Sequence, residues 1–436
     1  MNGRPAAVGP LVDHLFRRSA GRLVSSLARV FGAHRLDLAE EVVQEAMVEA
    51  LRRWPFAGIP ADPVAWLWRV ARNRALDRVR REATLRGRED ALVAAFARQA
   101  PEGGAGQDAG PWGDDELAML FAACHPALPR EARVALTLKT VGGLGVREIA
   151  RAFLAREATV AQRLVRAKRR LAQGGLRLEV PAGEEAEERL DSVLEVLYLL
   201  FNEGHLASEG DALLRADLCA EAIRLGELVA SRPVGRQPRV HALLALLWLG
   251  WARLPARTCP GGEPVPLAEQ DRSRWRPAGI ARGLAHLERA AAGGVEGRYH
   301  LEAAIAAAHV TAASWEATDW GWIVTLYDRL QAVEPSPVVA LNRAVAVAEA
   351  RGPGEALVEL RRLAGDPALD RYHLFHAVEA DLLARLGRAE EATAALDRAL
   401  ACPCTRPERE LLERRRRGGI IGGSPRRRRP GAGSPH

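Results

Sequence analysis

The stretch "WLWRVARNRALDRVRR", residues 66–81, places two tryptophans among six arginines. Apolar residues recur at the three- and four-residue steps of one helix face, and they are Val64, Leu67, Ala71, Ala75 and Val79. The polar side chains of this helix gather on another part of its surface, which carries Arg69, Arg72, Asn73 and Arg80 and is flanked by Arg74, Arg78 and Arg81. A solvated basic face is the ordinary interpretation. Guanidinium groups that bind phosphates, an amide that can read a base edge and stacking rings together favour nucleic-acid binding.

The preceding segment, residues 37–54, predicts a second amphipathic helix. Its apolar stripe consists of Leu38, Val42, Ala46, Ala50 and Trp54. The remaining surface is acidic and carries Glu40, Glu41, Gln44, Glu45 and Glu49. Such a face is either solvated or a docking surface for a basic partner. The proline-rich loop expected at 55–63 could shape a pocket for an extruded base.

Residues 146–171, "VREIARAFLAREATVAQRLVRAKRRL", have helix-turn-helix spacing. The second helix is predicted to bury Val160, Leu164, Ala167 and Leu171. Its outer face is predicted to offer Thr159, Gln162, Arg163, Arg166, Arg169 and Arg170. Gln and Arg near a helix N-terminus fit major-groove readout, with the later arginines on phosphates. An ordinary helical hairpin with a basic face is the alternative, because Leu154 stands where many such turns carry glycine.

The whole chain of 436 residues predicts an all-α protein of several domains. Ala, Leu, Arg and Glu dominate, and no segment has a convincing strand pattern. The net charge of +7 makes an acidic partner plausible but is weak support by itself. Five scattered cysteines favour a reducing cytoplasm over a disulfide framework. The pair Cys402 and Cys404 has no second pair beside it, so we expect no metal site and no cofactor.

Breaks in composition divide the chain into modules. Residues 101–111 form a Gly/Pro/Ala linker between two small helical modules, 10–100 and 112–178, and a long helical module follows at 186–413. Residues 414–436 form an arginine-rich, low-complexity tail that we expect to be disordered. The apolar run at 241–254 is too short to span a bilayer and predicts a buried helix, so no membrane association is expected.

The long module hints at tetratricopeptide-like packing. Gly387, Ala392 and Ala399, with Ala380 one turn earlier in the first helix of the pair, fit the small-residue spacing of that repeat. Irregular helical pairs are the alternative.

Three polar clusters in this module invite a catalytic interpretation. They are Asn202, Glu203 and His205; Glu269, Asp271, Arg272 and Arg274; and Asp319 beside Trp320 and Trp322. No catalytic motif accompanies them, so helix caps and salt bridges explain them better and we expect no enzyme.

The first two segments together, "LAEEVVQEAMVEALRRW" and "DPVAWLWRVARNRALDRVRR", resemble region two of the extracytoplasmic-function type sigma factors. Residues 114–171 resemble region four of the same family. The resemblance implies that the acidic helix docks on the beta-prime clamp of core RNA polymerase through Glu41, Gln44 and Glu45. It implies that Trp66, Arg69, Asn73, Arg74 and Arg78 line promoter DNA at the minus-ten element. Region four would then read the minus-thirty-five element.

The segments "VLYLLFNEGHLAS" (196–208) and "TDWGWIVTLYDRLQAVEPSPVVALNRAVAVAEA" (318–350) resemble the sigma-factor subgroup with a large helical, tetratricopeptide-like extension. The sequence thus favours a transcription initiation factor. A repressor or activator that never joins polymerase and a repeat scaffold with incidental basic helices are the alternatives. The acidic helix favours the first, because a simple repressor has no need of it. We expect the extension to act in cis, in either direction, and to offer a surface to a protein partner.

Overall fold

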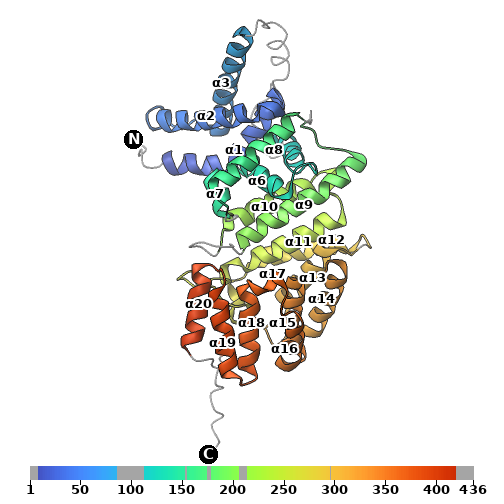
Figure 1. Cartoon of the computed structure of the whole chain (residues 1–436). Coiled ribbons are helices and arrows are strands. Elements are labelled where there is room, and N and C mark those ends of the chain that lie inside the picture. Colours follow the sequence, from blue (N-terminus) through green and yellow to red (C-terminus); the bar gives the residue numbers. More distant parts are fainter. Residues whose placement is uncertain are drawn as a thin grey trace, which may run out of the picture. The chain divides into compact units, whose positions relative to one another are not determined.

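The computed structural model describes residues 8–85, 112–152, 155–173, 178–205, 214–294 and 296–418. Every regular element in these residues is a helix, and an isolated bridge between Thr258 and Pro264 accompanies them (Figure 1). The all-α prediction is therefore confirmed for the described residues. The chain forms two compact units. The N-terminal unit comprises residues 1–200 and 224–235, and the C-terminal unit comprises residues 201–223 and 236–436.

In the described part of the chain, the helices from α1 to α10 lie wholly or partly in the N-terminal unit. They are α1 (Val8–Phe31), η2 (Ala33–Arg35), α2 (Leu36–Ala57), α3 (Pro63–Leu85), α5 (Trp112–Ala123), α6 (Arg130–Thr140), α7 (Val146–Ala152), α8 (Glu157–Gln173), α9 (Gly183–His205) and α10 (Ala216–Ala230), followed by the short η3 (Pro233–Gly235). The helices α9 and α10 each contribute residues to both units. Residues 183–200 and 224–235, expected in the long module or just before it, thus belong to the same unit as both small modules.

The remaining helices lie in the C-terminal unit. They are α11 (Pro238–Arg253), η4 (Leu254–Ala256), η5 (Leu267–Glu269), η6 (Arg272–Arg274), α12 (Pro277–Ala291), α13 (Arg298–Thr311), α14 (Trp320–Val333), α15 (Pro337–Ala350), α16 (Pro353–Arg362), α17 (Pro367–Asp370), α18 (His373–Arg385), α19 (Ala389–Ala401) and α20 (Arg406–Arg417). Proline starts α15, α16 and α17, because its fixed φ suits the first turn, where its missing N–H would have no partner in any case.

The core of the N-terminal unit forms around α1. Leu23, Leu27, Ala28 and Phe31 of this helix are almost completely buried, and α1 packs on both α2 and α5. At Gly21 a side chain would not fit, because a Cβ atom there would lie 1.9 Å from the carbonyl oxygen of Val141, just after α6. The bare backbone of Gly21 therefore allows α1 and the end of α6 to approach closely.

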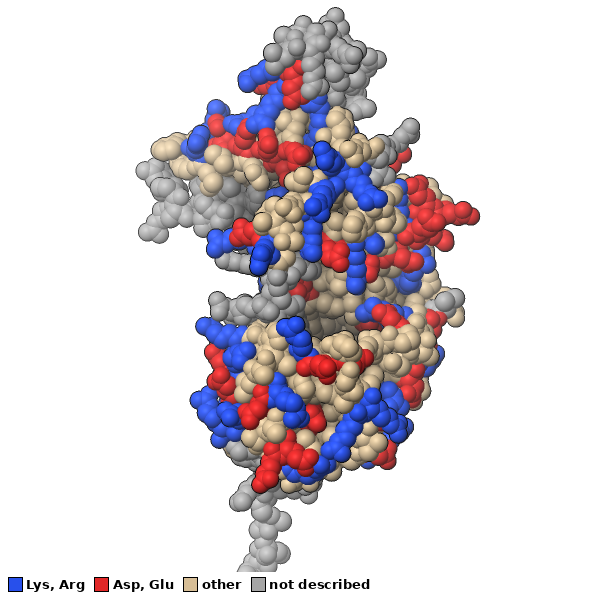
Figure 2. All heavy atoms as spheres, in the orientation of Figure 1, with Lys and Arg blue, Asp and Glu red and all other residues tan. Residues whose placement is uncertain are grey.

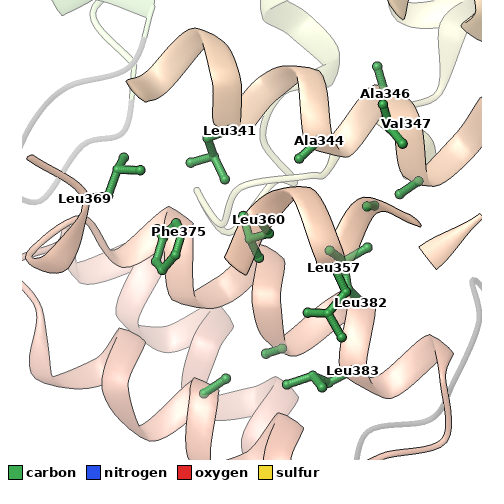
Figure 3. Packing of buried hydrophobic residues seen from close by; sticks show 14 of the residues in the cluster. Leu341, Ala344, Ala346, Val347, Leu357, Leu360, Leu369, Phe375, Leu382 and Leu383 are labelled. Atoms are coloured by element: carbon green, nitrogen blue, oxygen red, sulfur yellow. The ribbon is translucent and has the colours of Figure 1, made fainter. Parts of the chain in front are cut away.

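The core of the C-terminal unit is built from small and branched side chains of successive helices. Leu341, Leu357, Leu360, Leu382 and Leu383 meet in it (Figure 3). The pairs α14–α15, α15–α16 and α18–α19 pack closely. Ala380, Ala392 and Ala399 are buried, as their predicted role in close helix packing requires, and Gly387 adopts a φ of 76° between α18 and α19.

Several predictions from the sequence concern where helices lie and where they end. The apolar run 241–254 lies largely in α11 and is mostly buried, as predicted, and no described helix is long and apolar enough to cross a membrane. The helix α20 continues to Arg417, so the first four residues of the expected disordered tail are helical. A capping box of Thr405 and Glu408 starts this helix and explains its stability. The helix α2 runs through Pro55 to Ala57, which shortens the loop expected at 55–63. The linker at 101–111 lies outside the described residues.

Candidate nucleic-acid interface

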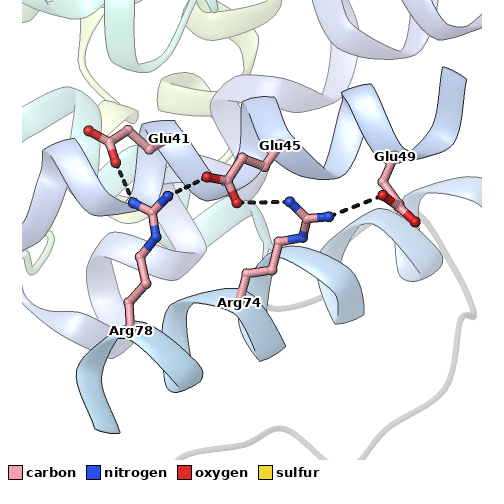
Figure 4. A network of polar contacts seen from close by, with 5 residues as sticks. All are labelled: Glu41, Glu45, Glu49, Arg74 and Arg78. Atoms are coloured by element: carbon pink, nitrogen blue, oxygen red, sulfur yellow. Dashed lines mark hydrogen bonds and ion pairs between the residues drawn. The ribbon is translucent and has the colours of Figure 1, made fainter. Parts of the chain in front are cut away.

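The basic helix α3 lies against the acidic helix α2 through a ladder of ion pairs (Figure 4). Arg74 donates to Glu45 at 2.8 Å and to Glu49 at 3.2 Å, and Arg78 donates to both Glu41 and Glu45. The two helices run antiparallel, so carboxylates four residues apart on α2 alternate with arginines four residues apart on α3. Two arginines expected on DNA and two glutamates expected on polymerase are thus partners of one another.

The ladder is only partly shielded from water. The side chains of Arg78 and Glu45 are each 36% exposed. The hydrogen bond from Arg78 to Glu41 is the main cause that raises the pKa of Arg78, and burial opposes it. Salt therefore screens these pairs, and each one contributes modestly to stability.

The face of α3 that points away from the ladder remains exposed. Arg69, Asn73 and Arg80 are exposed on it. Arg72 lies over the ring of Trp68 at 5.4 Å. The ring of Trp66 packs edge-on against buried Trp54 of α2 at 5.5 Å, so Trp66 is half-buried rather than openly displayed. Asn73 and Arg69 are therefore better placed for an external ligand than Arg74, Arg78 or Trp66.

The outer face of α2, which the sequence analysis predicted to be acidic, also carries exposed apolar side chains. Gln44 is exposed, and one and two turns beyond it Val48 and Leu51 are 46% and 43% exposed. Phe56 at the end of the helix is 92% exposed, and Ile59 in the following loop is 44% exposed. The spacing of Gln44, Val48 and Leu51 could have revealed this stripe. Together with Phe56 and Ile59 just beyond it, we call it the apolar face of α2 (Gln44, Val48, Leu51, Phe56 and Ile59).

The helix-turn-helix is formed by α7 and α8. Val160, Leu164, Ala167 and Leu171 of α8 are buried, as predicted. Thr159, Gln162, Arg166, Arg169 and Arg170 are exposed and Arg163 is half-buried. Leu154, in the turn, lies outside the described residues. The arginines of α8 that were predicted to contact DNA therefore lie along one face, opposite its buried side chains.

One edge of α8 contacts the start of α2. Lys168 donates to Asp37 at 2.6 Å and lies 3.1 Å from Glu40, and Lys139 of α6 lies 3.9 Å from Glu40. Burial acts to lower the pKa of Lys168, but Glu40 and Asp37 outweigh it and raise the pKa. Figure 2 shows basic side chains gathered over the part of the unit that holds α8, beside an acidic band over α2.

Three consecutive acidic residues of α5 connect α1, α5 and α10. Asp115 accepts a hydrogen bond from Arg29 at 2.6 Å, and Asp114 pairs with Arg232 at 2.8 Å. Glu116, only 2% exposed, accepts from both Nη atoms of Arg224 at 2.6 and 2.9 Å. Arg22 of α1 lies 3.6 Å from the same carboxylate. The sequence analysis did not single out these residues, which we call the α5 acidic triplet.

Two acidic members of the polar clusters that suggested catalysis cap helices. Asp271 caps η6 by accepting from the backbone of Ser273, and Asp319 caps α14 by accepting from that of Trp322. No group of three metal-binding side chains occurs among the described residues. Neither cap is placed like a catalytic group.

Comparison with known families agrees with this geometry. Residues 15–84 match the family Sigma-70 region 2, and residues 118–171 match Sigma-70, region 4. Residues 189–291 match a family of unknown function, DUF6596. No solved structure matches the chain.

The chain is also 43% identical over 389 residues to an uncharacterized protein of Rhizobium meliloti (strain 1021). The match covers 87% of this chain and 90% of that protein.

A polymerase-docking region two followed by a helix-turn-helix region four defines a sigma factor, a non-enzymatic protein of transcription initiation. The chain belongs to the extracytoplasmic-function type sigma factors that carry a helical DUF6596 extension. Its sigma regions imply that it binds core RNA polymerase and promoter DNA.

The ladder between α2 and α3 can be tested by a double-mutant cycle. The single changes Arg78→Ala and Glu45→Ala and the double variant should give a coupling energy of about 0.5–1 kcal/mol at low salt, because the pair is partly exposed. Urea denaturation measures the free energies of unfolding, and the coupling should shrink at high salt.

The control is Arg69→Ala, which removes an exposed arginine from the same helix and should change stability by no more than about 0.5 kcal/mol. A coupling energy of zero at low salt would contradict the ladder.

Proposed function

We propose that core polymerase docks on the apolar face of α2 together with the exposed edge of its carboxylates. The observation that carries this is the exposure of Val48 and Leu51 one and two helical turns beyond Gln44. Exposed apolar side chains in a row on a helix are typical of a surface that packs on a partner helix. Glu41 and Gln44 are exposed beside them and would supply polar contacts. Glu45 has a second role, because it also orients Arg74 and Arg78.

Co-purification with core RNA polymerase tests this docking surface. The change Leu51→Asp should abolish recovery of the complex, because a carboxylate would be desolvated at the center of the contact. The helical circular dichroism should stay unchanged, since Leu51 is 43% exposed in the isolated protein.

The matched control is Val358→Asp, an exposed apolar residue on α16 of the C-terminal unit. Recovery of Leu51→Asp with polymerase at the wild-type level would exclude this face.

For the minus-ten element we propose a division of roles along α3. Asn73 reads a base edge, and Arg69 and Arg80 bind phosphates on the exposed face. Trp66, Arg74 and Arg78 support this face from behind through Trp54 and the ladder, and reach DNA directly only if α3 shifts against α2. At the minus-thirty-five element, Thr159, Gln162, Arg163 and Arg166 face the groove and Arg169 and Arg170 bind phosphates.

The two classes of residue on α3 should give different mutant behaviour. Asn73→Ala should lose about 1–3 kcal/mol of discrimination at one base of the minus-ten element. Arg69→Ala should weaken open complexes on all promoter variants and flatten their salt dependence. Open-complex formation on single-base promoter variants at several salt concentrations measures both. Identical behaviour of the two variants would refute the division of roles.

We further propose that the contact between α8 and the start of α2 belongs to an inactive, closed form. The minus-ten and minus-thirty-five elements are about 25 base pairs, or roughly 85 Å of duplex, apart. A recognition helix whose Lys168 lies 2.6 Å from Asp37 cannot reach the distal element while α3 holds the proximal one. Binding to polymerase and promoter would therefore separate α8 from α2.

We propose that the extension controls this opening in cis, and its contacts with region four support this. Arg224 and Arg232 near the end of α10 pair with Glu116 and Asp114 of α5. On the other side, Arg130 of α6 lies 2.7 Å from Glu195 of α9. Residues of the extension thus hold the first helices of region four against α1. In the C-terminal unit, the α18–α19 pair with buried Ala380, Ala392 and Ala399 supports tetratricopeptide-like packing and a surface for a protein partner.

Gly21 offers a way to open the closed form without touching a polymerase- or DNA-facing residue. Gly21→Ala places a methyl group 1.9 Å from the Val141 carbonyl oxygen, so α1 and the end of α6 must separate. The change also favours the α1 helix itself. Transcription in vitro with purified polymerase should rise, while helicity and polymerase co-purification should stay as in wild type.

The matched control is Gly354→Ala, a helical glycine of α16 whose added Cβ would meet nothing within 4 Å. Unchanged or lower transcription from Gly21→Ala, with intact polymerase binding, would argue against an inhibitory closed form.

A further inference from the structure

The end of α11 in the C-terminal unit gathers cations around one tryptophan. Arg253 ends α11, Arg257 follows η4, and Arg272 starts η6. The guanidinium of Arg272 lies 4.7 Å from the center of the Trp275 ring, and that of Arg253 lies 5.9 Å from it. Trp275 itself is only 5% exposed. We call these four residues, with His205 and His309, the α11 cation cluster.

Each member of this cluster has a buried nitrogen without a hydrogen-bond partner. These atoms are Nε of Arg253, Nε of Arg257, Nη2 of Arg272, Nε1 of Trp275, Nδ1 of His309 and Nε2 of His205. Buried polar atoms in proteins are nearly always hydrogen-bonded, and leaving one unpaired costs free energy. The arginine and indole nitrogens among them are donors that an external acceptor can pair.

The three arginines lie beyond ion-pair distance of every described carboxylate. Among the described residues, no ion pair within 4.0 Å involves Arg253, Arg257 or Arg272, and Glu408 and Glu316 act on Arg257 and Arg272 only at longer range. Burial, and then the like charges of Arg257 and Arg272, lower the pKa of Arg253 to about 9. Burial, and then Arg253 and Arg272, lower the pKa of His309 to about 4. The cluster is therefore an uncompensated positive site.

Other half-buried arginines of the same unit have the usual partners. Arg343 pairs with Asp328 at 2.6 Å and with Glu359, and Arg385 donates to Glu349 at 2.5 Å. These arginines of the unit are balanced by carboxylates, which distinguishes them from the arginines of the α11 cation cluster. A cluster of unpaired charges is maintained against its desolvation cost when it serves binding.

We propose that the α11 cation cluster binds a small oxyanion ligand, one that presents a phosphate or carboxylate group. Guanidinium groups bind both through paired N–H donors. Arg272 is held in place for this, because its Nη1 donates to the carbonyl oxygens of His309 at 2.8 Å and of Ala312, while its Nη2 stays available. The guanidinium groups of Arg253 and Arg272 both lie over the Trp275 ring, and this contact limits the ordering that binding requires. The DUF6596 extension would thus be a ligand-binding module, which does not depend on how the sigma regions act.

Isothermal titration of the full-length protein with inorganic phosphate, and separately with citrate, tests the site. Wild type should bind at least one of the two probes. Arg253→Met and Arg257→Met keep the apolar stem of the side chain but remove its donors, so each should weaken binding by about tenfold or more. Quenching or enhancement of tryptophan fluorescence should report the same affinity, because Trp275 lies inside the cluster.

The matched control is Arg282→Met, which removes an exposed arginine that lies over Trp248 at 4.8 Å in the same unit. This variant should bind as wild type does. A phosphate response that Arg282→Met loses equally, or that chloride at the same ionic strength reproduces, would overturn the proposal, as would binding of neither probe by wild type.

A thermal-melting series separates a ligand site from a structural role. Without added anion, Arg253→Met should melt at the wild-type temperature or above it, because an unpaired buried cation has been removed. The binding probe should raise the melting temperature of wild type and of Arg282→Met but not that of Arg253→Met. A large loss of stability in Arg253→Met without anion, together with unchanged anion binding, would show that the cluster only supports packing.

Discussion

The buried carboxylate of Glu116 sets the constraint on which the rest of the N-terminal unit depends. A carboxylate that is 2% exposed must be paired with cations, because leaving it alone in the interior is strongly destabilising. One partner, Arg22 on α1, precedes Glu116 in the sequence, and the other, Arg224 on α10, follows it. The first helix of region two, the first helix of region four and α10 of the extension therefore meet at one carboxylate, and separating them removes part of its cation pairing.

The same unit shows how charges can serve two partners in turn. Glu41 and Glu45 lie on the helix that docks on polymerase in our proposal, and in the isolated protein they hold Arg74 and Arg78. Asp37 and Glu40 likewise hold Lys168 of the recognition helix. The pairs of Arg78 with Glu41 and Glu45 are partly exposed and weak, so polymerase or DNA can replace them at little cost, whereas the pair of Lys168 with Glu40 is largely buried. Such pairs suit a sigma factor that must exchange internal contacts for contacts with polymerase and promoter.

The extension contains two kinds of charged site: in one the arginines are paired with carboxylates, and in the other they are not. At α10, Arg224 and Arg232 are compensated and join the extension to region four. At the end of α11, Arg253, Arg257 and Arg272 have no ion-pair partner among the described residues, and Arg253 and Arg272 lie over one buried ring. The first arrangement stabilises a fold and the second is suited to a ligand. An extension with both features can hold the sigma regions and also respond to a small molecule.

The sequence by itself determined what is local. The three- and four-residue periodicity correctly predicted the all-α fold and the buried face of α8, and the motifs identified region two and region four. Only the tertiary structure decided which faces meet. The pairing of Arg74 and Arg78 with glutamates of α2 depends on the antiparallel register of two helices, and the α11 cation cluster joins residues from 205 to 309. Periodicity fixes the direction of a side chain around its own helix axis, but packing between distant segments fixes what that side chain touches.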